Sequence, residues 1–315
     1  MVIRFYDFAF NLKHIEPKFV SSSWRVCYNA EGTFEAHFPT ESEVLSLVAN
    51  SKYLVAVQGD FAAVITGYEA REDFTVYGRT CNWILKKRLV LPFESSNVFS
   101  GKFACDTVSE AFSDVSNFGV SAASYGQIIS YAKDNISTLY DVVRESLNMG
   151  SIGHTVRFDT KNKKWVFATI RSKETDLMVS ESLKNASDTA ITADILDLAD
   201  SGYYKKRTEN SDGSVSEKFT LLSAGAKTGI YRWEAILSGS SENEAKAVLK
   251  SKKENSELAL STHGIFYGKD YSLGDIVRVQ IVKGTLKKTA KRRISGVNVR
   301  YSGSAKFEEP IFEEV

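Results

Sequence analysis

The chain has 315 residues, and its 40 lysines and arginines nearly balance its 39 aspartates and glutamates, so the formal net charge is +1. This balance gives no general electrostatic attraction to nucleic acid or to an anionic membrane. Three widely spaced cysteines argue against a disulfide framework. We expect no signal peptide, because the N-terminus carries no basic region before a long apolar run. We expect no membrane partner, because no stretch reaches the roughly 18 apolar residues of a membrane span; the protein is expected to fold in the cytoplasm.

The first third of the chain has the pattern of short strands with one helix. Residues 53–57 and 61–65 flank a short glycine-containing turn, which predicts a β-hairpin, and residues 73–77 alternate with a period of two. Thr40 and Glu43 have the spacing of a capping box, and apolar residues follow them. This composition of elements is typical of a small barrel or sandwich.

The middle of the chain changes to helical spacing. Apolar residues recur behind Asp106, which is a candidate helix cap, and a second helix is predicted over residues 137–149. Residues 155–159 and 165–170 then predict a hairpin with a short polar turn. These elements indicate a compact α+β unit.

The last part returns to strands. Alternate residues from Tyr231 to Leu237 share one face of a predicted strand, and Ser241 with Glu244 forms another capping box. Further strands are predicted at residues 258–265, 276–282 and 294–301, a loop tip at residues 209–214, and an acidic tail at residues 306–315.

The predicted fold class is therefore α+β and rich in strands, with two small β-barrel domains flanking a compact α+β domain. We place the first barrel at residues 1–97 and the α+β domain, with its helices and hairpin, at residues 98–172. The second barrel, with one helix, is placed at residues 173–315.

Residue types that carry chemistry are scattered along the chain. No histidine or cysteine pair has metal-ligand spacing, and no phosphate-binding loop is complete. Asp194, Asp197 and Asp200 are predicted to form a solvated helix face, since i, i+3 spacing is common there. We expect no catalytic, cofactor or metal site and no enzymatic activity. The histidines are His14, His37, His154 and His263, and the cysteines are Cys27, Cys81 and Cys105.

One segment near the end of the chain concentrates positive charge. Six cations within eleven residues could engage phosphates. The simpler interpretation is a solvated hairpin whose charges discourage edge pairing, or a contact with an acidic neighbouring subunit, and we favour it. The six residues are Lys283, Lys287, Lys288, Lys291, Arg292 and Arg293.

The order of several motifs resembles the siphovirus ReqiPepy-type tail protein family and, through it, the hub proteins of phage baseplates and tail tips, including those of phage-tail-like bacteriocins. The motifs are residues 32–39, the segment 77–88 with Gly78 and Arg79, residues 138–143 with the hairpin at 165–167, and the segment 271–279 with Tyr271, Gly274 and Asp275. Gly274 and Asp275 also suit a turn, because glycine supplies a positive φ and aspartate accepts from backbone amides.

The resemblance implies a homotrimer of two-barrel subunits. Six barrels would form a ring that joins the hexameric tail tube to a trimeric spike or fibre at the distal end of a virion or tail particle. Implied partners are the tail tube protein, the spike or fibre, other baseplate proteins, and tape-measure protein with DNA passing through the channel. The basic segment could line or rim that channel.

Two alternatives from other functional classes stay open. A tail-associated cell-wall hydrolase or peptidase needs a carboxylate pair or a metal-ligand cluster, which the sequence does not display. A receptor-binding adhesin predicts a carbohydrate groove lined by Trp24, Trp165 or Trp233. We favour core positions for these tryptophans, since they lie within strand patterns.

Overall fold

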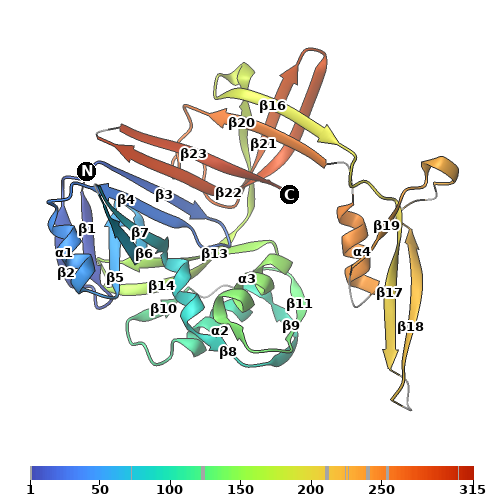
Figure 1. Ribbon diagram of the computed structural model, residues 1–315, viewed down its shortest axis with the longest axis horizontal. Helices are drawn as coiled ribbons and strands as arrows, with labels where there is room; N and C mark the ends of the chain where they lie inside the picture. Colours follow the sequence, from blue (N-terminus) through green and yellow to red (C-terminus); the bar gives the residue numbers. More distant parts are fainter. Residues whose placement is uncertain are drawn as a thin grey trace. The chain divides into compact units, whose positions relative to one another are not determined.

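The computed structural model describes residues 2–71, 73–121, 125–209, 213–223, 225, 227–238, 242–252, 255–303 and 305–315 (Figure 1). The chain divides into two compact units. Unit 1 comprises Met1–Ser187, Thr262–Gln280 and Lys288–Val315, and unit 2 comprises Asp188–Ser261 and Ile281–Lys287. No described helix is long and apolar enough to cross a membrane.

An eleven-stranded sheet dominates unit 1, which confirms the strand-rich prediction. Its path runs β15-β21-β22-β3-β4-β7-β6-β5-β1-β2, and β23 also pairs with β22. The path does not close among the described residues, so the two-barrel arrangement stays a prediction. The strands are β1 (Ile3–Asp7), β2 (Leu12–Glu16), β3 (Ser21–Cys27), β4 (Thr33–Phe38), β5 (Leu54–Gln58), β6 (Phe61–Ala70), β7 (Phe74–Thr80), β15 (Lys173–Ser180), β21 (Asp275–Lys283), β22 (Leu286–Ser302) and β23 (Ala305–Glu314).

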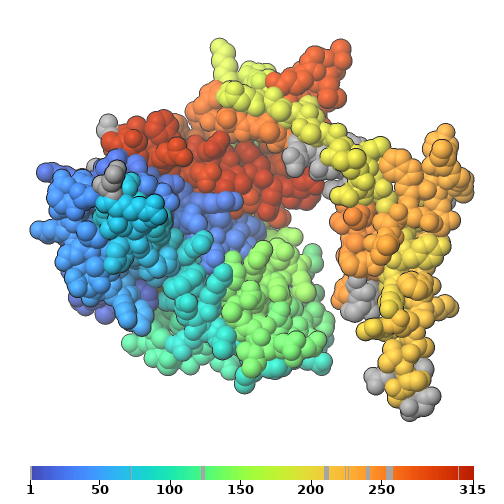
Figure 2. Space-filling model, viewed as in Figure 1, coloured from blue at the N-terminus to red at the C-terminus, as the bar shows by residue number. Residues whose placement is uncertain are grey.

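The long strand β22 connects the two ends of the sequence. It pairs antiparallel with β3 from Gly296 opposite Cys27 to Ser302 opposite Ser21. In the space-filling view the red C-terminal strands lie directly against the blue N-terminal segment (Figure 2). Strands that the sequence assigns to a first and a second barrel therefore share hydrogen bonds within one sheet.

Alternation explains which residues fill the core of this sheet. On β4 every second side chain is buried, as expected for a strand with one face on a core. Trp24, Phe34 and Phe74 are 0, 1 and 0% exposed. The Trp24 indole also donates to the buried Gln58 side chain at 2.7 Å, so its polar atom is paired.

The predicted α+β elements form a second core within unit 1. Thr138 caps α3 by accepting from the Asp141 N–H, close to the predicted start, and the predicted hairpin is present as β13 and β14. Helix α2 begins at Ser100, so Asp106 lies inside it and the predicted cap is wrong. The elements are η1 (Cys81–Lys87), β8 (Leu89–Val90), β9 (Phe93–Phe99), α2 (Ser100–Ala111), β10 (Phe118–Val120), β11 (Ile128–Lys133), β12 (Ser137–Thr138), α3 (Leu139–Met149), β13 (Ile152–Asp159), β14 (Lys164–Arg171) and η2 (Glu181–Leu183).

Two further local predictions in unit 1 need correction. Helix α1 (Glu43–Asn50) is capped by Ser42, whose hydroxyl accepts from the Val44 N–H at 3.2 Å, and not by Thr40. The predicted acidic tail is wrong, because residues 306–314 lie within β23, where Glu313 and Glu314 stand opposite Arg293 and Arg292. Cross-strand ion pairs thus account for Glu313 and Glu314.

Unit 2 contains a three-stranded sheet, β18-β17-β19, and helix α4. Its small core consists of Ala199, Tyr204, Leu237, Ala245 and Leu249. The elements in and around it are β16 (Ala186–Asp194), β17 (Ser201–Glu209), β18 (Val215–Ser223), η3 (Gly229–Tyr231), β19 (Glu234–Ile236), α4 (Glu242–Ser251) and β20 (Asn255–Thr262), and β16 pairs with β20.

Sequence patterns predict the elements of unit 2 less accurately than those of unit 1. Asp194 ends a strand and residues 195–200 are irregular, so the predicted aspartate helix face is wrong. The predicted strand from Tyr231 to Leu237 is only the short β19, and Tyr231 ends the 3-10 turn η3. The capping box at Ser241 and the loop tip at residues 210–212 lie outside the described residues.

Candidate functional site

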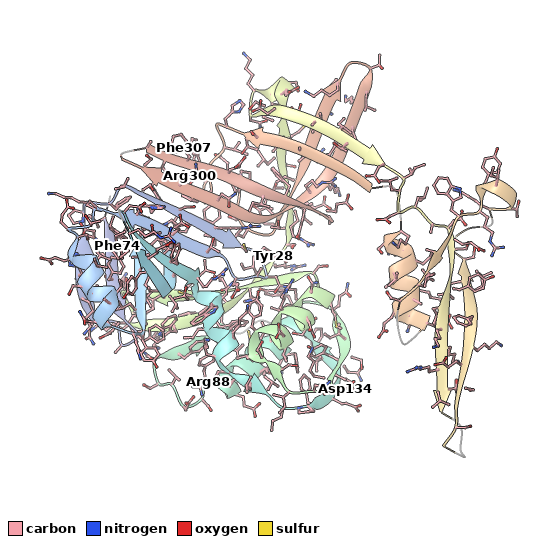
Figure 3. The ribbon with its side chains drawn as sticks, viewed as in Figure 1. Tyr28, Phe74, Arg88, Asp134, Arg300 and Phe307 are labelled. Atoms are coloured by element: carbon pink, nitrogen blue, oxygen red, sulfur yellow. The ribbon has the colours of Figure 1, made fainter. Side chains whose placement is uncertain are left out.

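Tyr28 lies where the three predicted domains meet within unit 1 (Figure 3). Its backbone N–H, just after β3, donates to the Ser295 carbonyl at 2.7 Å. Its hydroxyl donates to the Ser151 carbonyl at 3.0 Å and lies 2.8 Å from the Ser172 hydroxyl. The Arg293 guanidinium lies 5.3 Å from the centre of its ring, an arrangement typical of cation–π contact. Tyr28 therefore ties segments from all three parts of the sequence together.

Two glycines make room for the Tyr28 ring. A Cβ at Gly153 would lie 2.3 Å from Cε2 of Tyr28, and one at Gly274 would lie 2.6 Å from it. Gly274 also has a φ of +84°, as the turn prediction requires. Asp275, which follows it, accepts the Ser272 N–H at 2.8 Å. The sequence thus gives the turn chemistry at Gly274 but not the close approach of Tyr28.

The other turn-motif residues lie on different elements. Gly78 is in β7, where a Cβ would lie 2.8 Å from the Val64 carbonyl oxygen, and Arg79 beside it is exposed. Tyr271 is buried just before β21. Among the described residues of these predicted sites, Gly274 and Arg293 share the Tyr28 contact described above, and a role of the predicted residues in assembly stays a prediction.

The basic segment forms the hairpin between β21 and β22. Its last three cations pair with carboxylates: Lys291 with Glu174 at 2.6 Å, Arg292 with Glu314 at 3.5 Å and Arg293 with Glu313 at 2.9 Å. Lys283 ends β21, while Lys287 and Lys288 follow Leu286, the first residue of β22. The charge of the segment is thus partly neutralised, and a contact with a channel or a neighbouring subunit stays a prediction.

Three groups with residue types suited to catalysis are buried or are bonded in another way than a catalytic group. His154 is fully buried, and burial lowers its pKa to about 3. Burial also raises the pKa of the Cys81 thiol to about 12, which opposes thiolate chemistry. Ser42 donates to Glu16 at 2.7 Å while His14 lies 3.5 Å from that carboxylate, so the serine proton points to the acid and not to a histidine base.

Metal binding has no support among the described residues, which contain no group of three or more His, Cys, Asp or Glu side chains that could hold an ion.

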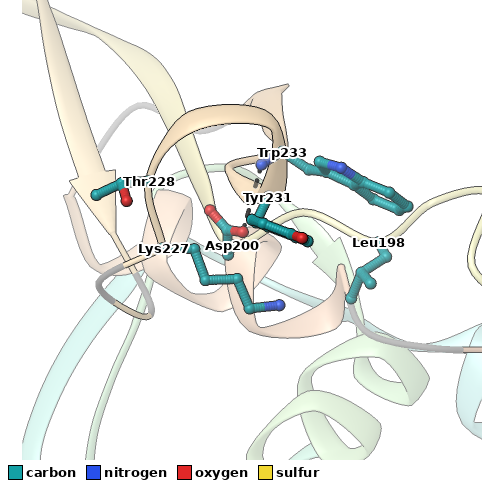
Figure 4. Close-up of a pocket in the computed structure, with 6 residues that line it drawn as sticks. All are labelled: Leu198, Asp200, Lys227, Thr228, Tyr231 and Trp233. Atoms are coloured by element: carbon teal, nitrogen blue, oxygen red, sulfur yellow. Dashed lines mark hydrogen bonds between the residues drawn. The ribbon is translucent and has the colours of Figure 1, made fainter.

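Unit 2 carries an open pocket of about 450 Å³ (Figure 4). Asp200, which precedes β17, contacts the loop after η3: its N–H donates to the Trp233 carbonyl at 3.0 Å, and the Trp233 N–H donates to its Oδ2 at 3.3 Å. Trp233 and Tyr231 are 41 and 75% exposed. The core position predicted for Trp233 is therefore wrong, whereas Trp24 and Trp165 are buried. The lining residues are Leu198, Asp200, Lys227, Thr228, Tyr231 and Trp233.

Solved structures similar to the chain come from phage tails. Prophage tail protein gp18 from Listeria monocytogenes EGD-e is 12% identical with a TM-score of 0.59, and the match covers 100% of this chain and 95% of that one. The tail protein from Neisseria meningitidis MC58 is 9% identical with a TM-score of 0.58, covering 99% and 96%. The 43 kDa tail protein of prophage MuSo2 from Shewanella oneidensis is 11% identical with a TM-score of 0.61, covering 100% and 98%.

The chain has the fold of prophage tail proteins. The resemblance inferred from the sequence motifs is thereby confirmed at the level of the fold. Neither a family model nor a curated protein matches the sequence.

Proposed function

We propose that the chain is a structural hub protein of a phage tail or phage-tail-like particle. The observation that carries this proposal is that the fold match to prophage tail proteins extends over the full chain and nearly the full length of the matched proteins. The proposal includes a position at the distal end of the tail tube, assembly in the host cytoplasm and no enzymatic activity. Its partners are the tube protein, a spike or fibre, other baseplate proteins, and tape-measure protein and DNA in the channel.

The proposed assembly is a homotrimeric ring in which each subunit contributes two barrel-like parts. A ring needs surfaces that pack against identical neighbours, and large exposed apolar patches mark such contacts. Unit 1 has an exposed apolar patch formed by Leu89, Leu91 and Ile136, with exposed fractions of 69, 71 and 61%. They lie beside each other, because Ser137 pairs with Val90 in the β8–β12 ladder.

Native mass measurement of the full chain, alone and with the tail tube protein, tests this proposal. We expect a species of three times 35.0 kDa. The double variant Leu91→Lys, Ile136→Lys should stay monomeric because each charge would be buried without a partner in the interface. Val20→Lys replaces another exposed apolar residue of unit 1, 60% exposed, and should leave the trimer intact. A dimer, or a chain that stays monomeric even with the tube, would contradict the proposal.

A further inference from the structure

The pocket of unit 2 has the size and the open aromatic surface of a small-molecule site. Its volume of about 450 Å³ lies within the range of ligand pockets. Trp165 is 2% exposed and Trp24 is completely buried, whereas Trp233 presents its ring to solvent beside Tyr231. Exposing two adjacent aromatic rings leaves apolar area in water that a ligand could cover.

Hydrogen bonds hold the backbone of Trp233 in a defined place. The Trp233 carbonyl accepts from the N–H groups of Asp200 and Ser201 at 3.0 and 3.2 Å. Gly202 permits the close approach of β19 to β17, because a Cβ there would lie 2.5 Å from the Ala235 carbonyl oxygen. Trp233 directly precedes β19, so its backbone is anchored to this strand pair.

The polar groups of the pocket carry both signs of charge. Lys227 and Asp200 both line the pocket, and Figure 4 shows their side chains on either side of the Tyr231 side chain. Among the residues that the structure describes, Lys227 forms no ion pair, and the contacts of Asp200 are long, at 3.2 Å from the Ser201 hydroxyl and 3.3 Å from the Trp233 N–H. Both groups thus keep hydrogen-bonding capacity for a ligand.

Two exposed aromatic rings together with one carboxylate and one ammonium favour some classes of ligand over others. A phosphate-rich ligand would meet the Asp200 carboxylate, and an apolar peptide would desolvate both charges without bonding them. A sugar offers hydroxyls that donate to a carboxylate and accept from an ammonium, and an apolar C–H face that packs on aromatic rings. We propose that the pocket formed by Asp200, Lys227, Tyr231 and Trp233 binds a neutral saccharide, a function that goes beyond the structural role of a hub.

Saturation-transfer NMR with the full chain tests this site directly. The probes are the methyl glycosides of glucose, galactose, mannose and N-acetylglucosamine at millimolar concentration. We expect transfer to at least one glycoside, and Trp233→Ala should weaken its affinity at least about tenfold. Phe219→Ala removes another exposed aromatic ring of unit 2, 68% exposed and not part of the pocket lining, and should leave the affinity unchanged.

A second variant separates binding from folding. Asp200→Asn keeps the shape of the side chain and should weaken the same glycoside severalfold, with an unchanged circular dichroism spectrum. Failure of every glycoside to bind, equal affinity in Trp233→Ala, or a trimer that closes the pocket against all four probes would overturn the proposal. The hub proposal is tested independently by the oligomeric mass, which Trp233→Ala should leave the same as in the unsubstituted chain.

Discussion

Acid is expected to destabilise unit 1 through His154. This histidine of β13 is 0% exposed, between the rings of Tyr140 and Phe167. Its Nδ1 lies 2.8 Å from the Asn29 side-chain oxygen, which fits a neutral ring that donates there. Burial, assisted by the charge of Arg144, lowers its pKa from 6.5 to about 3. The folded protein therefore resists protonation at this site.

The size of the effect follows from the two pKa values. Above pH 6.5 the ring is neutral in both states, and folding stability does not depend on it. Between pH 6.5 and about 3 the unfolded chain binds a proton that the folded chain does not, so stability falls as the pH falls. At pH 5 this loss is about 2 kcal/mol relative to pH 7, since one pKa unit corresponds to about 1.4 kcal/mol.

Urea unfolding at pH 7 and pH 5 measures this loss. In His154→Gln the difference in unfolding free energy between the two pH values should shrink by about 2 kcal/mol, even though the variant is less stable at both. His263→Gln, which removes an exposed histidine, should keep the contribution of His154. The reasoning would be refuted by an equal pH difference in His154→Gln and in the unsubstituted protein.

Three further substitutions test the junction, the buried hydrogen bonds and the basic hairpin. Gly153→Ala places a Cβ 2.3 Å from the Tyr28 ring and should cost about 1–3 kcal/mol in urea unfolding; an unchanged midpoint would mean that the ring moves freely. Asn82→Ala leaves one backbone N–H and one carbonyl without their side-chain partner and should cost about 2 kcal/mol or more; a neutral result would contradict the burial of both groups. Lys287→Glu should change stability by less than about 0.5 kcal/mol but reduce the yield of assembled particles counted by electron microscopy, and an unchanged yield would remove this residue from the proposed contacts.

Local signals in the sequence are sufficient to predict several helices and strands. The polar turn between residues 159 and 164 and the alternation on either side predict the hairpin β13–β14. Thr138 provides a cap side chain before the apolar spacing of α3, so the helix starts close to where the sequence indicates. The strand-rich class follows from the same alternation, because each period-two segment buries one face.

Long-range contacts could not be predicted in the same way. The pairing of β3 with β22 joins residues about 270 positions apart, and no local pattern encodes such a partner. Tyr28 and Gly153 fit each other only in three dimensions. In unit 2, the alternation around Trp233 predicts a core position, yet its backbone pairs with Asp200 outside β19 and the residue is 41% exposed.

Electron cryomicroscopy of the assembled tail particle tests the hub proposal most directly. The account predicts three copies of this chain in a ring below the last tube hexamer, with density for a spike or fibre beneath it. Finding the chain along the tail shaft, in a capsid, or in a ring of another symmetry would contradict the account.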